Sequence, residues 1–291
     1  MKKKVSLKTI NLNYIIALIP LILYGIYKNG IVLFQKEYVS FSYIFIILLM
    51  PFIAFAMGVL IEYIFNKKLI IISSFLPLYG IILSCLIYPG INIFIFSLII
   101  FLSLLLIHLL SVSKHFSLNP LALTQTLIFL IFLVLLKNNY QNIYESSTSL
   151  ALSLINIIFG RGVGGLFSTN IFLIIIALIY FSFTKLYKKE IPLYMLSTYI
   201  ILTIIITIVQ KDNINMLVNI AKSSVFFASV FIAPLTKESP YTRKGKLTYG
   251  VLLGVLGTFA TMFIDSVNGV FIAITIGSLF VKYIDDLFAL K

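Results

Sequence analysis

Apolar runs long enough to cross a bilayer recur along almost the whole chain, and they leave few folds open to it. A helix of about 20 residues crosses the roughly 30 Å hydrocarbon core and satisfies its own backbone hydrogen bonds there. Only 11% of the residues are charged and 61% are hydrophobic, with a mean hydropathy of +1.12. Soluble domains are about one quarter charged. The sequence therefore excludes a soluble globule and predicts an all-α polytopic membrane protein.

Ten of these runs are predicted to be transmembrane helices. They cover residues 13–27, 40–65, 69–88, 91–112, 121–136, 165–186, 191–209, 214–232, 247–264 and 267–283. The apolar segment 148–159 is too short to span at about 12 residues and is predicted to be re-entrant or interfacial. The chain then divides into an N-terminal five-helix half (1–136), an outer junction (137–164) and a C-terminal five-helix half (165–291). Polar loop 137–149 separates the two halves.

Basic residues indicate which side each loop occupies, because cytoplasmic loops carry the excess of Lys and Arg. With the N-terminus inside, sixteen basic residues fall on the inner side and five on the outer side. The inner ones are Lys2, Lys3, Lys4, Lys8, Lys67, Lys68, Lys114, Lys185, Lys188, Lys189, Lys237, Arg243, Lys244, Lys246, Lys282 and Lys291. The outer ones are Lys28, Lys36, Lys137, Arg161 and Lys211. This bias predicts two cytoplasmic termini and an extracytosolic loop 137–149.

Other features limit the chemistry of the chain. The net charge of +13 is distributed in short clusters between spans, a pattern typical of topology signals rather than of nucleic-acid binding. Cys85 is the single cysteine, so no intramolecular disulfide or complete iron–sulfur ligand set is possible. His108 and His115 have no clustered acid or cysteine, and no metal site is predicted. No catalytic side chain is predicted either.

Three ionisable residues lie in or beside predicted spans, where a charge is costly unless it is paired or hydrated. Glu62 is expected to pair with Lys67 and Lys68 near the inner end of its span. Lys222 could contact an anionic cofactor or extend to the headgroups. Asp265 is expected in a solvated outer turn. The sequence shows no buried acidic relay of the kind an autonomous ion pump would need.

Five stretches, in order, carry a resemblance to a known family. Residues 7–30 (LKTINLNYIIALIPLILYGIYKNG), 119–122 (NPLA), 164–171 (GGLFSTNI), 239–250 (SPYTRKGKLTYG) and 268–285 (NGVFIAITIGSLFVKYID) provide it. The chain resembles the RnfD/NqrB family, the membrane subunits D of Rnf electron-transport complexes and B of the sodium-pumping NADH:quinone reductase. The landmarks extend over nearly the whole chain.

The resemblance implies two related five-helix bundles in a bacterial cytoplasmic membrane. It also implies a non-autonomous subunit of a multi-subunit oxidoreductase that moves electrons across the membrane, with Na⁺ or H⁺ translocation as an additional option. In the family, a flavin transferase attaches FMN through its phosphate to a threonine after the fifth span. Thr148 is the matching residue here. The implied partners are other membrane subunits, the transferase and the lipid bilayer, and a second noncovalent flavin is a further option.

The flavin motif departs from the family pattern around Thr148. The positions of its aspartate, serine and proline hold Asn142, Glu145 and Ser149, and Ser146-Ser147 replaces a Gly-Ala pair. The alternative interpretation is a solvated loop in which Thr148 caps the following short helix. Further candidates for the flavin environment are Ser147, Gly164, Gly165, Ser168, Thr169 and Lys222. The glycines could instead mediate close helix packing.

Two other functions remain open at this stage. A solute transporter or channel could use a similar two-repeat bundle, with midplane breaks at the glycine cluster and at Asn119-Pro120. A redox-inactive scaffold would have lost the flavin but would still recruit partner subunits. The basic inner loop 236–246 could contact either a partner subunit or anionic headgroups.

Overall fold

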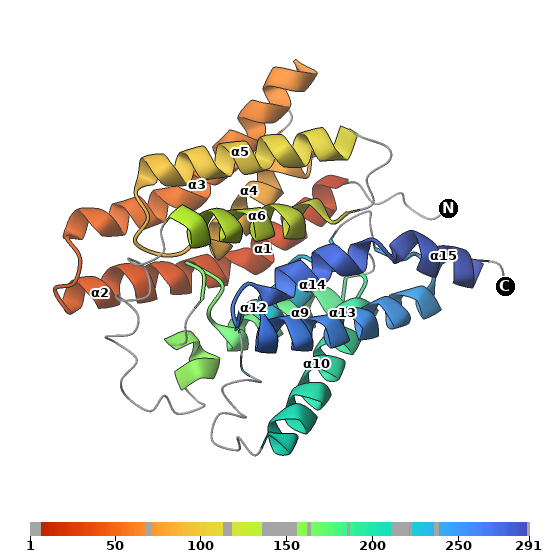
Figure 1. Ribbon diagram of the computed structural model, residues 1–291. Coiled ribbons are helices and arrows are strands. Elements are labelled where there is room, and N and C mark those ends of the chain that lie inside the picture. Colours follow the sequence, from red (N-terminus) through yellow and green to blue (C-terminus); the bar gives the residue numbers. More distant parts are fainter. Residues whose placement is uncertain are drawn as a thin grey trace.

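The computed structural model describes residues 7–67, 71–112, 118–135, 156–161, 164–184, 187–210, 221, 223–235 and 239–289. Every regular element within these ranges is a helix, and the helices form a bundle (Figure 1). The predicted all-α class is confirmed. Thr148, Ser147, Lys222 and His115 lie outside the described residues.

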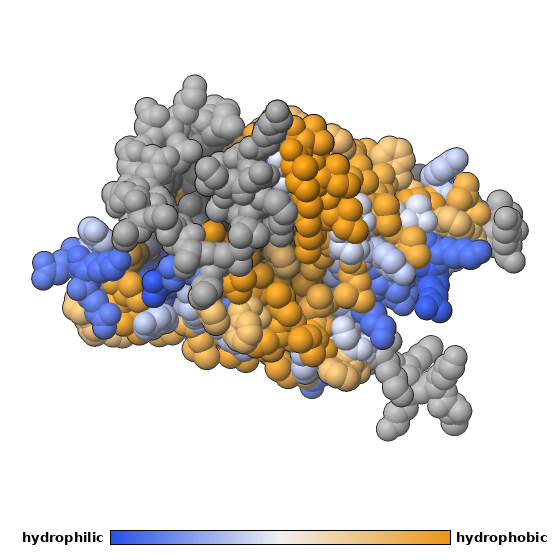
Figure 2. Space-filling view, turned by 90° about the horizontal axis from the view of Figure 1, so that it is seen from below, coloured by the Kyte–Doolittle hydropathy of each residue, from blue (hydrophilic) through white to orange (hydrophobic). Residues whose placement is uncertain are grey.

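Five helices in the described part of the chain are long and apolar enough to span a bilayer. Helix α1 (Leu7–Ile26) continues through a π-helical turn, η1 (Tyr27–Ile31), into α2 (Val32–Gln35). The others are α3 (Phe41–Asn66), α5 (Ile93–Val112), α10 (Glu190–Val209) and α13 (Arg243–Phe263). Large apolar side chains such as Phe94 and Phe52 are 81% and 66% exposed, as expected for a surface solvated by lipid. Figure 2 shows apolar residues over the middle of one face, with hydrophilic residues toward its two ends.

The remaining predicted spans contain shorter helices. These are α4 (Leu76–Leu86), α6 (Pro120–Leu135), α9 (Ile171–Ser182), α12 (Ser223–Phe231) and α14 (Gly269–Ser278), with η2 (Ile157–Arg161) in the predicted short segment. A turn at Leu279–Phe280 separates α14 from α15 (Val281–Ala289), so the tenth predicted span is interrupted. Every residue of α4 is buried. Non-helical backbone beside such helices is tolerated because neighbouring protein groups, rather than lipid, surround it.

The helices before residue 136 and those after residue 170 pack in the same pattern. In the first part, α3 packs against α4 and α5, α6 packs against α4 and α5, and α1 packs against α4. In the second part, α10 packs against α12 and α13, α14 packs against α12 and α13, and α9 packs against α12. The two parts meet where α1 contacts α9 and where α6 contacts α14. The starts of α1 and α15 lie toward the same end of the bundle (Figure 1).

Asn119 bridges the two parts at the start of α6. Its side-chain oxygen accepts a hydrogen bond from the Ala122 amide at 3.1 Å and so caps the helix. Its side-chain nitrogen donates to the Ile232 carbonyl, just after α12, at 3.3 Å. The Asn119 backbone amide donates to the Ser278 hydroxyl at 2.9 Å. The NPLA stretch therefore begins a helix and also holds the end of α12.

Asn268 occupies the corresponding place at the start of α14. Its side-chain nitrogen donates to the Tyr88 hydroxyl, two residues after α4, at 2.6 Å. The same nitrogen and the Asn268 backbone amide donate to Asp265, which also accepts from the Val267 amide. Asp265 is half-buried and organises the turn between α13 and α14. Asn119 at the start of α6 therefore contacts the chain just after α12, and Asn268 at the start of α14 contacts the chain just after α4.

We expect Asn119→Ala and Asn268→Ala to lower the melting temperature of the purified protein in detergent. Each substitution removes a long-range hydrogen bond to a buried or half-buried group, and loss of such a bond costs about 1–3 kcal/mol. Asn92→Ala is the matched control, because Asn92 is exposed and bonds locally to the Phe94 amide at 2.8 Å. The control should show the smaller decrease. Equal decreases for all three variants would contradict a bridging role.

Candidate functional site

The segment of residues 164–170, here called the crossing segment, is buried and non-helical ahead of α9. The Leu166 amide donates to the Ile87 carbonyl at 2.7 Å, and the Phe167 amide donates to the Cys85 carbonyl at 3.1 Å. On the opposite side, the side chain of Asn29 donates to the Leu166 carbonyl at 2.5 Å. These bonds satisfy backbone groups that would otherwise be unpaired in an apolar interior.

The absent side chain of Gly165 permits the close approach of the crossing segment to α4. A Cβ atom at Gly165 would lie 2.5 Å from the Cys85 carbonyl oxygen and 2.6 Å from the Leu86 Cα atom. On α1, a Cβ atom at Gly25 would lie 2.7 Å from the Leu166 carbonyl oxygen. Gly164 is buried in the same segment. Gly25 and Gly165 therefore serve close backbone packing on both sides of the crossing segment.

The polar side chains of the crossing segment lie in the protein interior. Ser168 and Thr169 are each 1% exposed. Asn170 accepts a hydrogen bond from the Leu173 amide at 3.0 Å and caps α9, and it donates to the Phe159 carbonyl of η2 at 3.3 Å. Tyr24 also donates to the Phe159 carbonyl. The Thr169 hydroxyl oxygen has no hydrogen-bond partner among the described residues. A buried hydroxyl with open bonding capacity fits a polar atom of a bound group.

The predicted contacts of Glu62 are corrected by the structure. Glu62 is 7% exposed and accepts hydrogen bonds from Asn66 and Ser74 rather than pairing with Lys67. Helix α3 ends at Asn66, and Lys67, which follows with a positive φ of 50°, is exposed. Residues 71–75 return toward the helix and supply Ser74. Lys68 lies outside the described residues.

His108 packs against an aromatic ring. The ring centroids of His108 and Phe65 are 4.3 Å apart, which places the imidazole at the contact between α5 and α3. No group of three potential metal ligands occurs within the residues that the structure describes.

A cavity of about 200 Å³, here called the corner cavity, lies between the start of α1, the end of α9 and the chain after α12. Its lining includes the aromatic residues Tyr14, Phe181 and Tyr187, here called the floor, and the polar residues Asn13, Thr184 and Lys188, here called the rim. The rings of Phe181 and Tyr187 stack with centroids 4.6 Å apart, and those of Tyr14 and Phe181 are equally close. Burial raises the pKa of Tyr187 well above its ordinary value, so its hydroxyl stays protonated and donates to the Val230 carbonyl at 2.9 Å.

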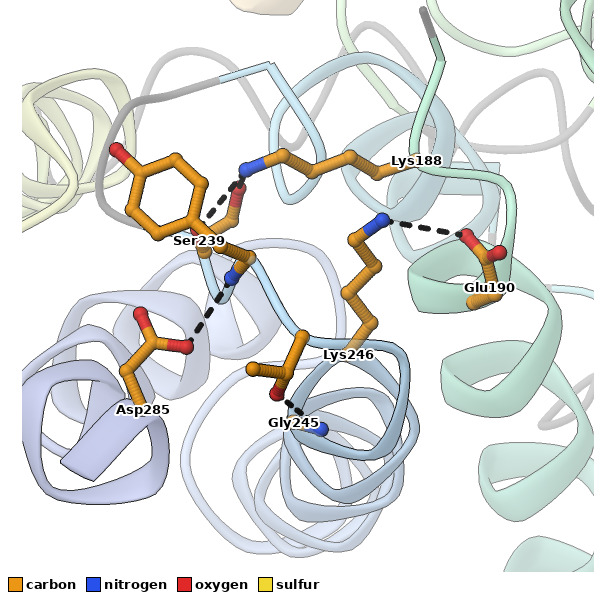
Figure 3. Close-up of polar contacts among 8 residues, drawn as sticks. Lys188, Glu190, Ser239, Gly245, Lys246 and Asp285 are labelled. Carbon is orange, nitrogen blue, oxygen red and sulfur yellow. Dashed lines mark hydrogen bonds and ion pairs between the residues drawn. The ribbon is translucent and has the colours of Figure 1, made fainter. Parts of the chain in front are cut away.

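Lys188 connects the rim of the corner cavity to the SPYTRKGK stretch (Figure 3). Its ammonium group donates to the Ser239 carbonyl at 2.9 Å and to the Ser239 hydroxyl, and lies 5.0 Å from the centre of the Tyr241 ring. The Tyr241 amide donates to Asp285 of α15 at 3.1 Å. This stretch is therefore held from two sides.

The first helical turn after this stretch has its own contacts. The Thr242 hydroxyl accepts from the Gly245 amide at 3.0 Å and caps α13. Lys246 approaches Glu190 at 4.0 Å. Arg243 and Lys244 are exposed. Loop 236–246 was predicted to contact either a partner subunit or anionic headgroups, and that prediction stays open. Within its described residues 239–246, the contacts of Tyr241, Thr242 and Lys246 position the start of α13.

The crossing segment and the corner cavity differ in what they can hold. The corner cavity is not lined by any of the candidate residues of the crossing segment, Gly164, Gly165, Ser168 and Thr169. The crossing segment offers a buried hydroxyl between tightly packed backbones. The corner cavity offers an aromatic floor with a cationic rim. Residues 137–149, the predicted flavin attachment region, lie outside the described ranges.

Sequence reasoning missed the asparagines that organise these sites. Asn11, Asn29 and Asn268 are buried, and each donates to a chain segment distant in sequence. Their signal in the sequence was an amide side chain in or at the end of a long apolar run, where a polar group needs a partner. The corner cavity had no comparable signal, because its lining residues come from five separate stretches.

The described helices and buried polar contacts define a multi-pass α-helical membrane protein with helical packing repeated along the chain. The chain belongs to the NQR2, RnfD, RnfE family, which it matches over residues 1–291. No curated relative matches the sequence. The family match confirms the resemblance seen in the five sequence landmarks and indicates a membrane subunit of a multi-subunit complex of the Rnf/Nqr type.

We expect Gly165→Ala to destabilise the protein and Gly257→Ala to be tolerated. The first substitution forces a methyl group against the Cys85 carbonyl, and overpacking of this kind costs about 1–3 kcal/mol or more. The second meets no atom within 4 Å and replaces a helical glycine of α13. Melting temperatures should fall for Gly165→Ala and stay level or rise for Gly257→Ala. The reverse order would contradict the packing role of Gly165.

Proposed function

We propose that this protein is the flavin-carrying membrane subunit of an Rnf/Nqr-like complex that moves electrons across the bacterial cytoplasmic membrane. The observation that carries the proposal is the family match over residues 1–291. In the family, the stretch corresponding to 142–150 holds FMN on its threonine, and Thr148 occupies that position. The protein works with other membrane subunits and is not an autonomous enzyme.

The proposed topology has ten spans in two related five-helix halves, with both termini in the cytoplasm. The repeated helix contacts support this arrangement, as do the corresponding bridges made by Asn119 and Asn268. The charge distribution supports the orientation. In this topology the corner cavity faces the cytoplasm, and Asp265, Tyr88 and loop 137–149 lie toward the outer face.

Each candidate residue has a distinct role in the proposal. Thr148 supplies the oxygen for the phosphoester bond that a flavin transferase makes, and Ser147 and Lys222 belong to the same outer environment. The Thr169 hydroxyl, which is buried and lacks a hydrogen-bond partner among the described residues, and the neighbouring Ser168 belong to the proposed surroundings of the flavin. Gly165 permits the close approach of the crossing segment to α4, and Gly164 is buried beside it. FMN supplies one- and two-electron redox chemistry when bound, and the protein contributes its position and surroundings.

Ion coupling is a property of the proposed complex, with Na⁺ or H⁺ as the coupling ion. Glu62 is the buried carboxylate within the described spans, and its partners Asn66 and Ser74 are neutral. A buried carboxylate with neutral partners can exchange a bound cation or proton without first breaking an ion pair. Glu62 is therefore the residue of this chain that we propose as a candidate for ion coupling.

We expect a fluorescent flavin band under ultraviolet light when the denatured protein is made with a competent flavin transferase. Thr148→Ala should abolish the band because the attachment oxygen is lost. The matched control is Ser147→Ala, which removes the neighbouring hydroxyl and should keep the band. Peptide mass mapping should place the added mass of FMN on the peptide containing residue 148. Flavin released on denaturation would measure any second, noncovalent flavin separately.

A fluorescent band that survives Thr148→Ala would refute this attachment site. A wild-type protein without flavin that still joins partner subunits would support the scaffold alternative. Solute flux by the purified flavin-free protein would support the transporter alternative.

The proposed topology predicts opposite labelling of two exposed lysine positions. In a Cys85→Ala background, Lys36→Cys should react with a membrane-impermeant maleimide in intact cells. Lys189→Cys should react only after the cells are permeabilised. Both lysines are exposed, and Cys85 itself is fully buried. Labelling with the reverse dependence on permeabilisation would contradict the orientation.

A further inference from the structure

The corner cavity has a composition suited to an amphipathic anion. Tyr14, Phe181 and Tyr187 form an apolar floor, whereas Asn13, Thr184 and Lys188 place polar groups on the rim. None of the described residues that line it is acidic. Lys188 contributes a positive charge to the lining, and its ammonium group also bonds to Ser239. A ligand with a negative head and an apolar body would match both parts.

The size and position of the cavity restrict this ligand further. Sites that enclose a drug-sized molecule have volumes of roughly 300–1,000 Å³. About 200 Å³ is sufficient for a small head group whose remaining atoms lie outside the cavity. Tyr241, at the edge, is 70% exposed, and Leu247 on the next helix is 40% exposed. Aromatic and apolar side chains exposed beside basic ones are typical of the membrane–water interface.

Exposed basic residues surround the same corner. Lys189 follows Lys188 directly, and Arg243 and Lys244 begin α13 beside Tyr241. Each Lys or Arg near an anionic leaflet adds electrostatic attraction to it. Lys246 contributes less, because it approaches Glu190 at 4.0 Å. The surface around the cavity thus favours the negatively charged inner leaflet as the source of the ligand.

We propose that the corner cavity binds the phosphate-containing head group of an anionic phospholipid. The Lys188 ammonium group attracts the phosphate, and the side-chain nitrogen of Asn13 can donate to its oxygens. The Thr184 hydroxyl donates to the Phe181 carbonyl at 2.7 Å, and its oxygen can accept a hydrogen bond from a hydroxyl of the glycerol head group. The aromatic floor packs against the adjoining apolar atoms. Because the cavity joins α1 to the chain around α9 and α12, a bound lipid would stabilise the contact between the two parts of the molecule.

Native mass spectrometry of the purified full-length protein tests this proposal. Delipidated protein is supplied with phosphatidylglycerol or phosphatidylcholine of the same acyl chains, and the retained lipid is counted. We expect preferential retention of phosphatidylglycerol and a decrease of about fivefold or more in Lys188→Gln. Lys188→Arg should retain it. Lys189→Gln is the matched control, because it removes the same charge from an exposed neighbour and should change retention less than twofold.

A second variant separates lipid binding from the contact between Lys188 and Ser239. Thr184→Phe fills the rim of the cavity and keeps Lys188, so it should also reduce retention of phosphatidylglycerol. Ile176→Phe, at a lipid-facing position that is 44% exposed, is its control and should have no effect. The melting temperatures of all variants without added lipid identify any general loss of folding.

Retention of phosphatidylglycerol by both Lys188→Gln and Thr184→Phe would overturn the proposal. Stabilisation by inorganic phosphate but not by phosphatidylglycerol would also overturn it, because the ligand would then be a soluble phosphate. Loss of noncovalent flavin in Thr184→Phe with unchanged lipid retention would assign the cavity to flavin instead. Covalent flavin on Thr148 is measured in the same samples, so failure of the proposed function is distinguished from failure of lipid binding.

Discussion

The need to pair every backbone polar group away from lipid governs this structure. Long helices meet that need internally, but α4 and α12 contain only 11 and 9 residues. Their ends must be completed by other parts of the protein. Asn119 reaches the backbone carbonyl of Ile232 after α12, and Asn268 reaches the side-chain hydroxyl of Tyr88 after α4. The short helices are therefore stable only inside the assembled bundle, and the two parts of the chain depend on each other.

The crossing segment solves the same problem with backbone groups. The amides of Leu166 and Phe167 donate to carbonyls at the end of α4. The side chain of Asn29 in η1 donates to the Leu166 carbonyl of the crossing segment. That arrangement requires Gly165, because a side chain would occupy the space of the Cys85 carbonyl. Few buried polar side-chain atoms among the described residues then lack a hydrogen-bond partner. The Thr169 hydroxyl is one of them, and it lies close in sequence to the capping residue Asn170.

The corner cavity and the crossing segment illustrate two different uses of polar residues in an apolar protein. In the crossing segment, polar groups complete the backbone and leave little open volume. In the corner cavity, Lys188 both fixes Ser239 and contributes charge to an open volume with an aromatic floor. The first arrangement holds the two parts of the bundle together. The second provides a surface that a small amphipathic molecule can occupy.

Much of the fold could be predicted from residue patterns, but the sites could be predicted less well. Each of the ten predicted spans contains a helix in its described part, although the first extends to Gln35 and the tenth is interrupted after Ser278. Glu62 was expected beside lysines because they are close in sequence, but the returning chain supplies Ser74 instead. The glycine cluster was open to two interpretations, and the distances from Gly165 show close packing.

The sequence by itself determined the membrane class, the family and the positions of the helices, because these depend on local apolar length and on motifs in a fixed order. The tertiary structure alone decided which helices are short and buried, which asparagines bridge the two parts, and where Lys188 meets Ser239. The physical reason is that hydrophobic length is a property of one segment. Pairing of a buried polar group depends on a partner whose distance along the chain reaches 180 residues, as for Asn268 and Tyr88.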